Sequence, residues 1–341
     1  MTYFVQFSGT GLRIRADPDE TLLAAGLRQG LALPYGCQSG RCGSCRARVL
    51  SGTVESPPAE QAGLSAAERA AGYVLICQSR AQSDIELHLH QPPGGERRRP
   101  RLLTARVAGK RALAADVIEL TLQLPKGVPF EYLPGQYVDF LLDDGRRRSF
   151  SIAKAAASHG QVQFHLRVAP DGKFAAFVRD RLPARSLLRF EGPLGAFYRR
   201  EELRLPILLM AGGTGFAPIR AIIESALETP ERPAMHLYWG ARSTDDLYQH
   251  ALAARWADHH RDFRYTPVLS EPNPGWTGKR GLVHQALLGE NPQLGGHAVY
   301  LAGPPAMVHA GRQEFLSAGL NPDHLFYDSF DYAFETWPAL G

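Results

Sequence analysis

Three of the four cysteines in this 341-residue chain lie within nine positions of one another, in the glycine-rich stretch PYGCQSGRCGSC. Four residues separate Cys37 from Cys42, two separate Cys42 from Cys45, and Cys77 follows after 31 more. Structural zinc sites more often use two short Cys-x2-Cys pairs, whereas one such pair beside a four-residue step is typical of a [2Fe–2S] cluster. The spacing therefore predicts an iron–sulfur centre with these four ligands, and leaves zinc or four unrelated thiols as the alternatives.

The glycines beside these cysteines fit an iron–sulfur centre. A cluster bound by thiolates carries negative charge and is stabilised by N–H groups that point at its sulfurs. Gly36, Gly40 and Gly43 would let the backbone curl closely around the cluster, because glycine adopts positive φ values readily. Further along, His88 and His90 share one face of a strand-like run, which favours surface strand residues over a metal-binding pair.

The elements expected around the cysteines form a small domain. Residues 2–7 and 11–16 alternate like the strands of a hairpin, and residues 19–30 indicate a helix with an acidic start and a glycine stop. Residues 46–52 and 84–90 also alternate like strands, and a strand-like run at 73–79 can carry the fourth cysteine to the others. Residues 1–91 therefore resemble a plant-type ferredoxin domain of the β-grasp fold.

The pattern of apolar residues divides the rest of the chain into a linker and two further domains. Proline, glycine and arginine concentrate in residues 92–101, which predicts an exposed linker. Residues 102–203 contain six short apolar runs with polar turns between them, and these predict an antiparallel β-barrel domain. From residue 204 to 341 apolar strands alternate with helices, which predicts a doubly wound, nearly parallel α/β domain. The fold class is thus multidomain, α+β followed by α/β.

One barrel strand carries a motif that resembles a known family. Arg148-Ser149-Phe150-Ser151 matches the Arg-x-aromatic-Ser signature of the ferredoxin–NADP reductase superfamily. The resemblance implies that Arg148 binds the FAD pyrophosphate, as a guanidinium fork suits. It further implies that Phe150 lies along the isoalloxazine ring and that the Ser151 hydroxyl reaches flavin N5, which makes Ser151 the candidate catalytic residue. All four residues are candidate cofactor contacts.

The same resemblance assigns a second flavin contact to the stretch DGKFAAFV, with Gly172, Lys173, Phe174 and Ala175 as candidate residues. Relatives in this superfamily usually have serine or threonine where this chain has Ala175. Without that hydroxyl, the phosphate would depend on the backbone N–H groups of residues 173–176 at a helix start.

Two glycine-containing turns in the last domain resemble the nucleotide signatures of the superfamily. Gly212-Gly213-Thr214-Gly215 follows a buried strand and opens a helix, which places a pyrophosphate at the helix N-terminus. Gly303 and Pro304 resemble the turn beside the nicotinamide, with Ala302 in the place of a cysteine. Phe330 near the C-terminus is a candidate to cover the flavin ring, and a tail packed on the surface is the alternative.

The preference between NADH and NADPH depends on the stretch GARSTDDLY. Arg242 and Ser243 could hold a 2′-phosphate, whereas Asp245 and Asp246 could repel one and bind a ribose hydroxyl. The acidic pair favours NADH, and Arg242 is a candidate cofactor contact in either case.

The order of the three domains resembles the NAD(P)H-dependent reductases of multicomponent oxygenases and the reductase of a CDP-6-deoxy-sugar dehydrase. The family implies FAD. NADH gives two electrons as a hydride, a [2Fe–2S] cluster accepts one, and a flavin converts between them. The expected partners are the nucleotide and a protein electron acceptor, either an oxygenase component or a dehydrase. A redox sensor that does not turn over is the alternative from another class.

The charge and composition of the chain argue against nucleic-acid-binding and membrane proteins. The net charge of +4 and the scattered basic residues do not suggest nucleic acid as a partner. The sequence has no apolar run of membrane-spanning length and its start alternates like a strand, so we expect no membrane association and no signal peptide. A cytoplasmic monomer with reduced thiols is therefore expected.

Overall fold

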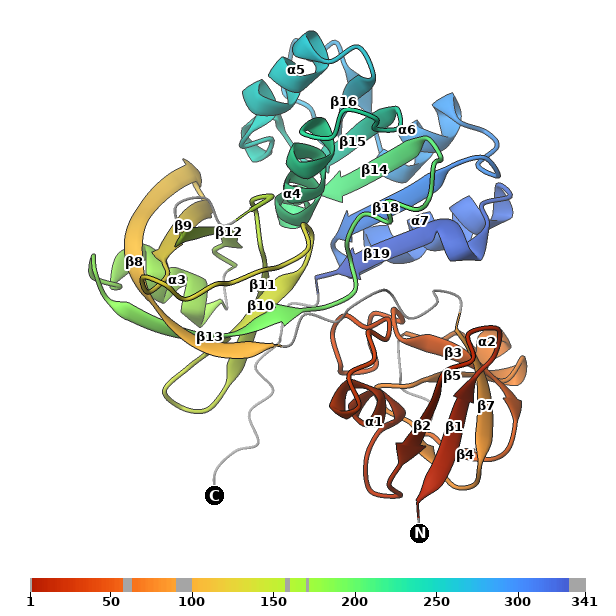
Figure 1. Ribbon diagram of the computed structural model, residues 1–341. Helices are drawn as coiled ribbons and strands as arrows, with labels where there is room; N and C mark the ends of the chain where they lie inside the picture. Colours follow the sequence, from red (N-terminus) through yellow and green to blue (C-terminus); the bar gives the residue numbers. More distant parts are fainter. Residues whose placement is uncertain (1, 58–62, 90–99, 157–159, 170–171, 331–341) are drawn as a thin grey trace, which may run out of the picture. The chain divides into compact units, whose positions relative to one another are not determined.

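The computed structural model describes all residues except 1, 58–62, 90–99, 157–159, 170–171 and 331–341 (Figure 1). The chain divides into two compact units, Met1–Arg99 with Gly195–Phe197, and Pro100–Leu194 with Tyr198–Gly341. The second unit contains both the barrel and the parallel sheet expected from the sequence. The finer boundaries at residues 91, 101 and 203 stay predictions, and most of the predicted linker lies outside the described residues.

The first unit contains a five-stranded mixed sheet. Its elements are β1 (Tyr3–Phe7), β2 (Arg13–Ala16), α1 (Leu22–Arg28), β3 (Arg46–Ser51), β4 (Val54–Glu55), α2 (Ala66–Ala70), β5 (Tyr73–Leu75), β6 (Arg80–Ala81) and β7 (Ile85–Leu89). The strand order is β2-β1-β7-β3-β5; β1 and β7 are parallel, and the other neighbours are antiparallel. This arrangement is the β-grasp sheet expected from the sequence, and β4 pairs separately with β6.

Alternation and capping explain why these elements form. Val5 and Phe7 on β1 face the core while their neighbours face outward, as a half-buried strand requires. Helix α1 begins after Thr21, whose hydroxyl accepts a hydrogen bond from the N–H of Ala24 at 3.2 Å. His88 lies on β7 with its Nδ1 atom 3.2 Å from Ser8 Oγ, and His90 lies outside the described residues.

The second unit begins with an antiparallel sheet that closes on itself. Its elements are β8 (Arg101–Ala114), β9 (Val117–Gln123), β10 (Tyr137–Leu141), β11 (Arg147–Ser151), β12 (Gln161–Arg167), α3 (Lys173–Asp180) and β13 (Leu187–Leu194). The strand order is β11-β10-β13-β8-β9-β12. A bridge between Ile152 and Phe164 joins the two edges, so the sheet is the predicted barrel.

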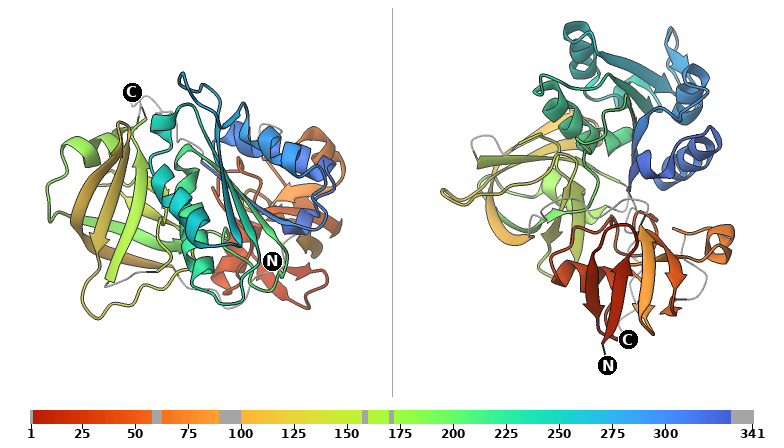
Figure 2. Two further views of the ribbon diagram at one scale, coloured as in Figure 1. Left: turned by 90° about the horizontal axis from the view of Figure 1, so that it is seen from above. Right: turned by 45° about the vertical axis from the view of Figure 1, so that its right-hand side comes forward.

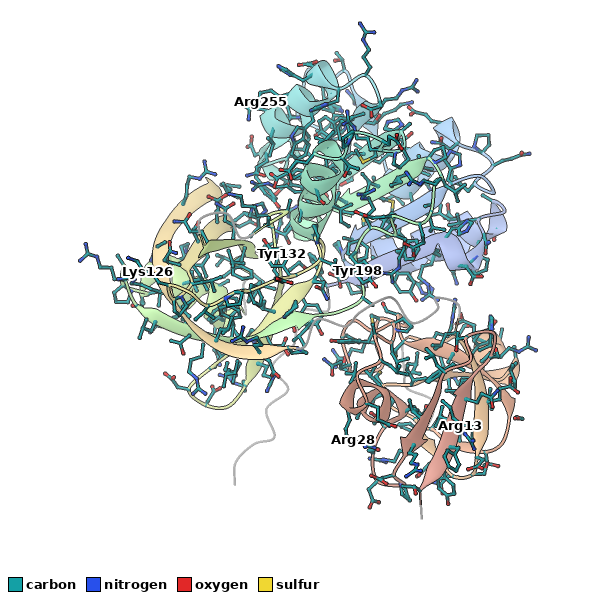
Figure 3. All side chains as sticks on the ribbon, in the orientation of Figure 1. Arg13, Arg28, Lys126, Tyr132, Tyr198 and Arg255 are labelled. Carbon is teal, nitrogen blue, oxygen red and sulfur yellow. The ribbon has the colours of Figure 1, made fainter. Side chains whose placement is uncertain are left out.

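Aromatic side chains fill the barrel. Phe140 lies at their centre, with its ring 5.1 Å from that of Phe164 and 5.3 Å from that of Phe174. Tyr132, labelled in Figure 3, is also buried there, and its hydroxyl donates to the carbonyl oxygen of Lys154 at 3.0 Å. This packing fixes the strands from which the flavin motif projects.

A six-stranded parallel sheet follows the barrel. Its elements are β14 (Ile207–Gly212), the 3-10 helix η2 (Gly213–Gly215), α4 (Phe216–Leu227), β15 (Met235–Ala241), η3 (Thr244–Asp246), α5 (His250–His259), β16 (Phe263–Leu269), β17 (Lys279–Arg280), α6 (Val283–Glu290), β18 (Ala298–Gly303), α7 (Pro305–Ser317), η4 (Pro322–His324) and β19 (Leu325–Ser329). The order is β17-β16-β15-β14-β18-β19, with all neighbours parallel. Helices α4 and α5 cover one face and α6 and α7 the other (Figure 2).

Strand order places the two predicted nucleotide turns together. The chain runs outward from β14 to β17 and then returns to β18 on the other side of β14, so the direction of winding reverses between β14 and β18. Ligands of doubly wound sheets bind at this reversal, beyond the carboxyl ends of the strands. Strand β19, which the sequence did not predict, extends the sheet beside β18.

Among the described residues, no helix combines the length and the apolar character needed to cross a bilayer.

Candidate functional site

The four cysteines form two pairs of thiols. The backbone N–H of Cys37 lies 3.4 Å from Cys42 Sγ, and the N–H of Cys42 lies 3.3 Å from Cys37 Sγ, so these two residues bond each other reciprocally. Cys45 Sγ lies 3.1 Å from Cys77 Sγ, although 32 positions separate them in the sequence. Strand β5 ends two residues before Cys77 and so delivers the fourth sulfur to the loop.

Backbone N–H groups point at these sulfurs, as the sequence predicted for a cluster site. The N–H of Ser39 donates to Cys37 Sγ at 3.4 Å, and the N–H of Ser44 donates to Cys42 Sγ at 3.5 Å. The loop can turn in this way because Gly40 and Gly43 adopt φ values of 79° and 77°. Gln38 also has a positive φ, of 55°, which the sequence did not indicate.

Hydrogen bonding within each pair sets the thiol pKa values. The hydrogen bond with Cys42 lowers the pKa of Cys37, and the same bond together with burial raises the pKa of Cys42. The hydrogen bond with Cys45 likewise lowers the pKa of Cys77, while that bond and burial raise the pKa of Cys45. In each pair the pKa of one thiol is therefore lowered toward the thiolate, the form of cysteine that binds metal.

Two pairs of thiols fit a binuclear cluster better than a single ion. A structural zinc site gathers its four ligands around one atom. Here the four donors are all sulfur and form two pairs, and backbone N–H groups point at the first pair. This arrangement fits a [2Fe–2S] cluster, which Cys37, Cys42, Cys45 and Cys77 would hold.

One basic residue beside the cluster loop is already neutralised. Arg46 follows Cys45 and forms an ion pair with Glu68 of α2, and its guanidinium lies over the ring of Tyr73. The side chain of Arg46 is only 12% exposed. Arg46 therefore adds little positive charge to the surface on which a protein acceptor could bind.

The two faces of β11 separate the residues of the flavin motif. Phe150 is paired with Val138 and Arg148 with Phe140, so both side chains point to the barrel side of the strand. Phe150 is only partly buried, with its ring 5.8 Å from that of Phe140 and 5.6 Å from that of Phe174. A partly exposed aromatic ring beside a guanidinium fits a planar, phosphate-bearing cofactor.

Ser149 points to the opposite face of β11. Its hydroxyl donates to Asp139 Oδ1 at 2.6 Å, and burial raises the pKa of Asp139. A cofactor contact from Ser149 would therefore come from its backbone.

The second predicted flavin contact lies at the start of α3. Gly172 is the N-cap of this helix, and the N–H of Ala176 already donates to the Gly172 carbonyl at 3.1 Å. Of the four predicted phosphate donors, the N–H of Ala176 is thus engaged within the helix. Phe174 and Ala175 are buried, and Phe174 packs on Phe150, which brings both flavin motifs to one end of the barrel.

The nucleotide turns lie side by side at the reversal of the parallel sheet. A Cβ atom on Gly215 would lie 2.0 Å from the carbonyl oxygen of Ala302, so β18 approaches the turn as closely as glycine permits. A Cβ atom on Gly303 would lie 3.0 Å from the N and O atoms of Gly212. Thr214 is buried, and Pro304 precedes α7. The structure thus brings the predicted Gly212–Gly215 and Gly303–Pro304 segments together.

Ser151 lies beside a carboxylate that the sequence did not reveal. Its hydroxyl donates to Asp328 Oδ2 at 3.2 Å, although 177 positions separate the two residues. Asp328 lies on β19 opposite Ala302 of β18. Two residues further, the N–H of Phe330 donates to the Gly303 carbonyl at 2.9 Å. The Ser151 hydroxyl, the Asp328 carboxylate and the nicotinamide turn therefore adjoin one another, whereas a flavin contact by the Phe330 ring stays a prediction.

Arg167 at the end of β12 is a second residue that sequence reasoning missed. Its Nη1 atom lies 3.0 Å from Asp116 Oδ2, and its buried Nη2 atom has no hydrogen-bond partner among the described residues. A Cβ atom on Gly213 would lie 3.3 Å from Nη2. Buried guanidinium nitrogens normally have partners, so this one fits an anionic group bound at the glycine turn. Nothing in the local sequence distinguishes Arg167 from other strand residues.

The segment after β15 contains the residues that are predicted to decide between NADH and NADPH. Arg242 Nε lies 3.4 Å from Asp246 Oδ2, which also accepts from the N–H of Ser243 at 3.3 Å and from its hydroxyl at 3.4 Å. One carboxylate thus occupies both groups that could hold a 2′-phosphate.

Three family models match the chain. The 2Fe-2S iron-sulfur cluster binding domain matches residues 5–82, the oxidoreductase FAD-binding domain residues 104–198, and the oxidoreductase NAD-binding domain residues 209–313. The predicted order of iron–sulfur, flavin and nucleotide domains is therefore confirmed, and so are the three cofactors: a [2Fe–2S] cluster, FAD and a nicotinamide nucleotide.

Proteins of similar sequence and structure cover nearly the whole chain. The CDP-6-deoxy-L-threo-D-glycero-4-hexulose-3-dehydrase reductase of Yersinia pestis is 36% identical over 330 residues, which are 97% of this chain and 99% of that protein. The reductase subunit of an aromatic O-demethylase from an Amycolatopsis species is 36% identical over 336 residues, again 97% and 99%. The crystal structure of the Amycolatopsis cytochrome P450 reductase GcoB has a TM-score of 0.75 at 34% identity, over 96% of this chain and 99% of that chain.

Proposed function

Because this chain belongs to the family of NAD(P)H-dependent iron–sulfur flavoprotein reductases, we propose that it takes electrons from NADH and delivers them one at a time to an oxygenase component. The chain is an oxidoreductase with domains for a [2Fe–2S] cluster, FAD and a nicotinamide nucleotide. The proposed location is the cytoplasm, where thiol ligands stay reduced. The observation that carries the proposal is the contact between Ser151 and Asp328, because it joins the flavin motif to the edge of the nucleotide sheet.

The residues of the site are proposed to bind FAD and NADH and to orient them toward each other. When bound, FAD supplies the exchange between a two-electron hydride and single electrons. Arg148 would hold the pyrophosphate of FAD, and Phe150 would lie along its ring. Arg167 and the N-terminus of α4 would hold the pyrophosphate of NADH. Asp328 Oδ2 accepts a hydrogen bond from the Ser151 hydroxyl and so holds that hydroxyl in place.

Four cysteine thiolates would hold the cluster, which is the last electron carrier in the proposed route from NADH to the acceptor. We assign Cys37, Cys42, Cys45 and Cys77 to the cluster, with the N–H groups of Ser39 and Ser44 among those that stabilise the charge on sulfur.

The terminal acceptor has two candidates. Oxygenase reductases such as the O-demethylase subunit support an oxygenase component. A CDP-sugar dehydrase is the second candidate, because the similarity to the dehydrase reductase extends over the same share of the chain. Mixing the reduced protein with each purified acceptor and measuring the rate of electron loss would separate the two.

An anaerobic titration with NADH tests the proposed function. The visible spectrum of the purified protein should show flavin and iron–sulfur absorbance, and both should bleach as NADH is added. Purified protein that contains zinc but neither iron nor flavin would contradict the proposal. So would a flavin that NADH reduces while the cluster stays oxidised, because the electrons would then have no route between them.

We expect Asp246→Ala to improve the use of NADPH. Removing this carboxylate frees the Arg242 guanidinium and the Ser243 hydroxyl to bind a 2′-phosphate. The KM for NADPH should fall by about tenfold, the effect of gaining one hydrogen bond to a charged group. Asp245→Ala is the matched control, because Asp245 is the exposed neighbour of Asp246. Steady-state kinetics with both nucleotides would measure the change, and equal KM values in the two variants would refute the assignment.

A further inference from the structure

A buried polar network joins the barrel to the nucleotide-binding part of the second unit. His165 of β12 lies at its centre, with no exposed side-chain surface. The His165 Nδ1 atom lies 3.1 Å from the Tyr248 hydroxyl, and Nε2 lies 3.2 Å from Arg220 Nη1 of α4. Glu119 of β9 lies 3.7 Å from the same Arg220 atom. We refer to Glu119, His165, Arg220 and Tyr248 as the His165 network.

The partners of His165 fix its protonation. Arginine can only donate hydrogen bonds, so Nε2 must accept from Arg220. The proton of the neutral ring is therefore on Nδ1, which donates to the Tyr248 oxygen. Burial, together with the positive charges of Arg220 and Arg111, lowers the pKa of His165 well below its usual range. The imidazole ring is thus neutral, and its two nitrogens have fixed roles: Nε2 accepts a hydrogen bond from Arg220 of α4, and Nδ1 donates one to Tyr248.

The charges of the network are paired. Both carboxylate oxygens of Glu119 accept from Arg111, at 3.2 and 3.1 Å. Arg220 Nε donates to Glu224 Oε1 at 2.8 Å, and Glu224 Oε2 accepts from the N–H of Ala155 in the barrel at 3.4 Å. Helix α4 is therefore held on the barrel at two successive turns. Removing one member would leave its partner buried and unsatisfied, which is costly in a low-dielectric setting.

The network also reaches the glycine turn. The edge of the Tyr248 ring meets Trp239 with ring centroids 5.2 Å apart and planes at 86°. Trp239 stacks on Phe216, the first residue of α4, at 3.9 Å, and Trp239 Nε1 donates to the carbonyl oxygen of Gly213 at 3.1 Å. His165 is thus connected to the nucleotide turn by two paths, one along α4 and one through Tyr248 and Trp239.

We propose that His165 is a positioning residue that holds the nucleotide turn of residues 212–215 in place against the flavin barrel, and that it thereby sets the rate of hydride transfer. The network connects strands β9 and β12 of the barrel to helix α4 and to Tyr248. Helix α4 follows the nucleotide turn directly, and Tyr248 reaches the turn through Trp239. Hydride transfer depends steeply on the separation and alignment of donor and acceptor, so a small shift of the turn would slow it. This inference rests on the proposed route from NADH to FAD.

The test uses the full-length, cofactor-loaded protein and two readouts. His165→Leu should slow the reduction of FAD by NADH in rapid mixing by about tenfold, because a misplacement of a fraction of an ångström is enough for such an effect. The Kd for NADH should change less than this rate. Backbone hydrogen exchange at residues 212–220, measured without nucleotide, should become faster. His165→Gln should restore part of the rate of FAD reduction and part of the protection from exchange, because the glutamine amide oxygen can accept from Arg220.

Two further variants keep the proposal falsifiable. Tyr248→Phe removes only a hydroxyl, so it tests the same path should His165→Leu fail to fold. His236→Leu is the matched control, since His236 is a mostly buried histidine of β15 that bonds Thr266 at 2.8 Å, outside the network. Unchanged flavin reduction and unchanged exchange at the turn in both Tyr248→Phe and His165→Leu would overturn the proposal, and Tyr248→Phe alone decides should His165→Leu fail to fold. Equal losses in His236→Leu would also overturn it, because they would show a general loss of stability. If NADH fails to reduce the wild-type flavin, the proposed function fails, and hydrogen exchange still tests the role of His165.

Discussion

Cys42→Ser should abolish electron delivery to a one-electron protein acceptor and leave the reduction of ferricyanide by NADH. Cys42 is buried, and its sulfur both accepts from Ser44 and bonds reciprocally with Cys37. A serine oxygen is a harder and less readily ionised ligand, so the cluster should not form properly. The flavin motifs at residues 148–151 and 172–175 lie in the second unit, so FAD should stay bound. Iron content, the visible spectrum and the two activities measure the result.

The matched control for this variant is Ser39→Ala. Ser39 lies in the same loop, and its backbone N–H, which alanine retains, donates to Cys37 Sγ, so only its side-chain hydrogen bond to Cys37 is lost. This variant should keep iron and both activities. If folded, flavin-loaded Cys42→Ser lost both activities together, the proposed order of electron carriers would be wrong, because ferricyanide reduction would then require the cluster.

Gly215→Ala should destabilise the second unit and prevent flavin reduction by NADH. The added Cβ would lie 2.0 Å from the oxygen and 2.4 Å from the carbon of the Ala302 carbonyl, and backbone cannot rotate away as a side chain can. Strand β18 and the start of α4 would have to separate. We expect a loss of about 3 kcal/mol in the free energy of unfolding, the upper range for overpacking in a core. Denaturant unfolding and NADH-driven flavin reduction measure the two effects.

Gly289→Ala provides the comparison for Gly215→Ala. Gly289 lies in α6, and a Cβ atom there would have no described atom within 4 Å apart from its chain neighbours and the backbone of its own helix. Alanine favours helix there and should raise the free energy of unfolding by up to about 1 kcal/mol. Equal unfolding curves for the two variants would show that β18 does not approach Gly215 closely.

Local features of the sequence determined which chemistry this protein can perform. The spacing of Cys37, Cys42 and Cys45 identified the cluster, because ligands a few residues apart must share one loop whatever the rest of the chain does. The Arg148–Ser151 motif and the Gly212–Gly215 turn could likewise be predicted, since each is a contiguous segment with a strand or helix beside it. The alternation of apolar residues gave the strands that carry them.

Only the tertiary structure decided which distant groups meet. Asp328 reaches Ser151 because β19 joins the sheet beside β18, and a five-residue strand near the C-terminus has too little periodicity to be recognised. Arg167 meets Gly213 because the barrel packs on the glycine turn, and His165 meets Arg220 for the same reason. Such contacts depend on how separate elements pack, and local spacing carries no information about that packing.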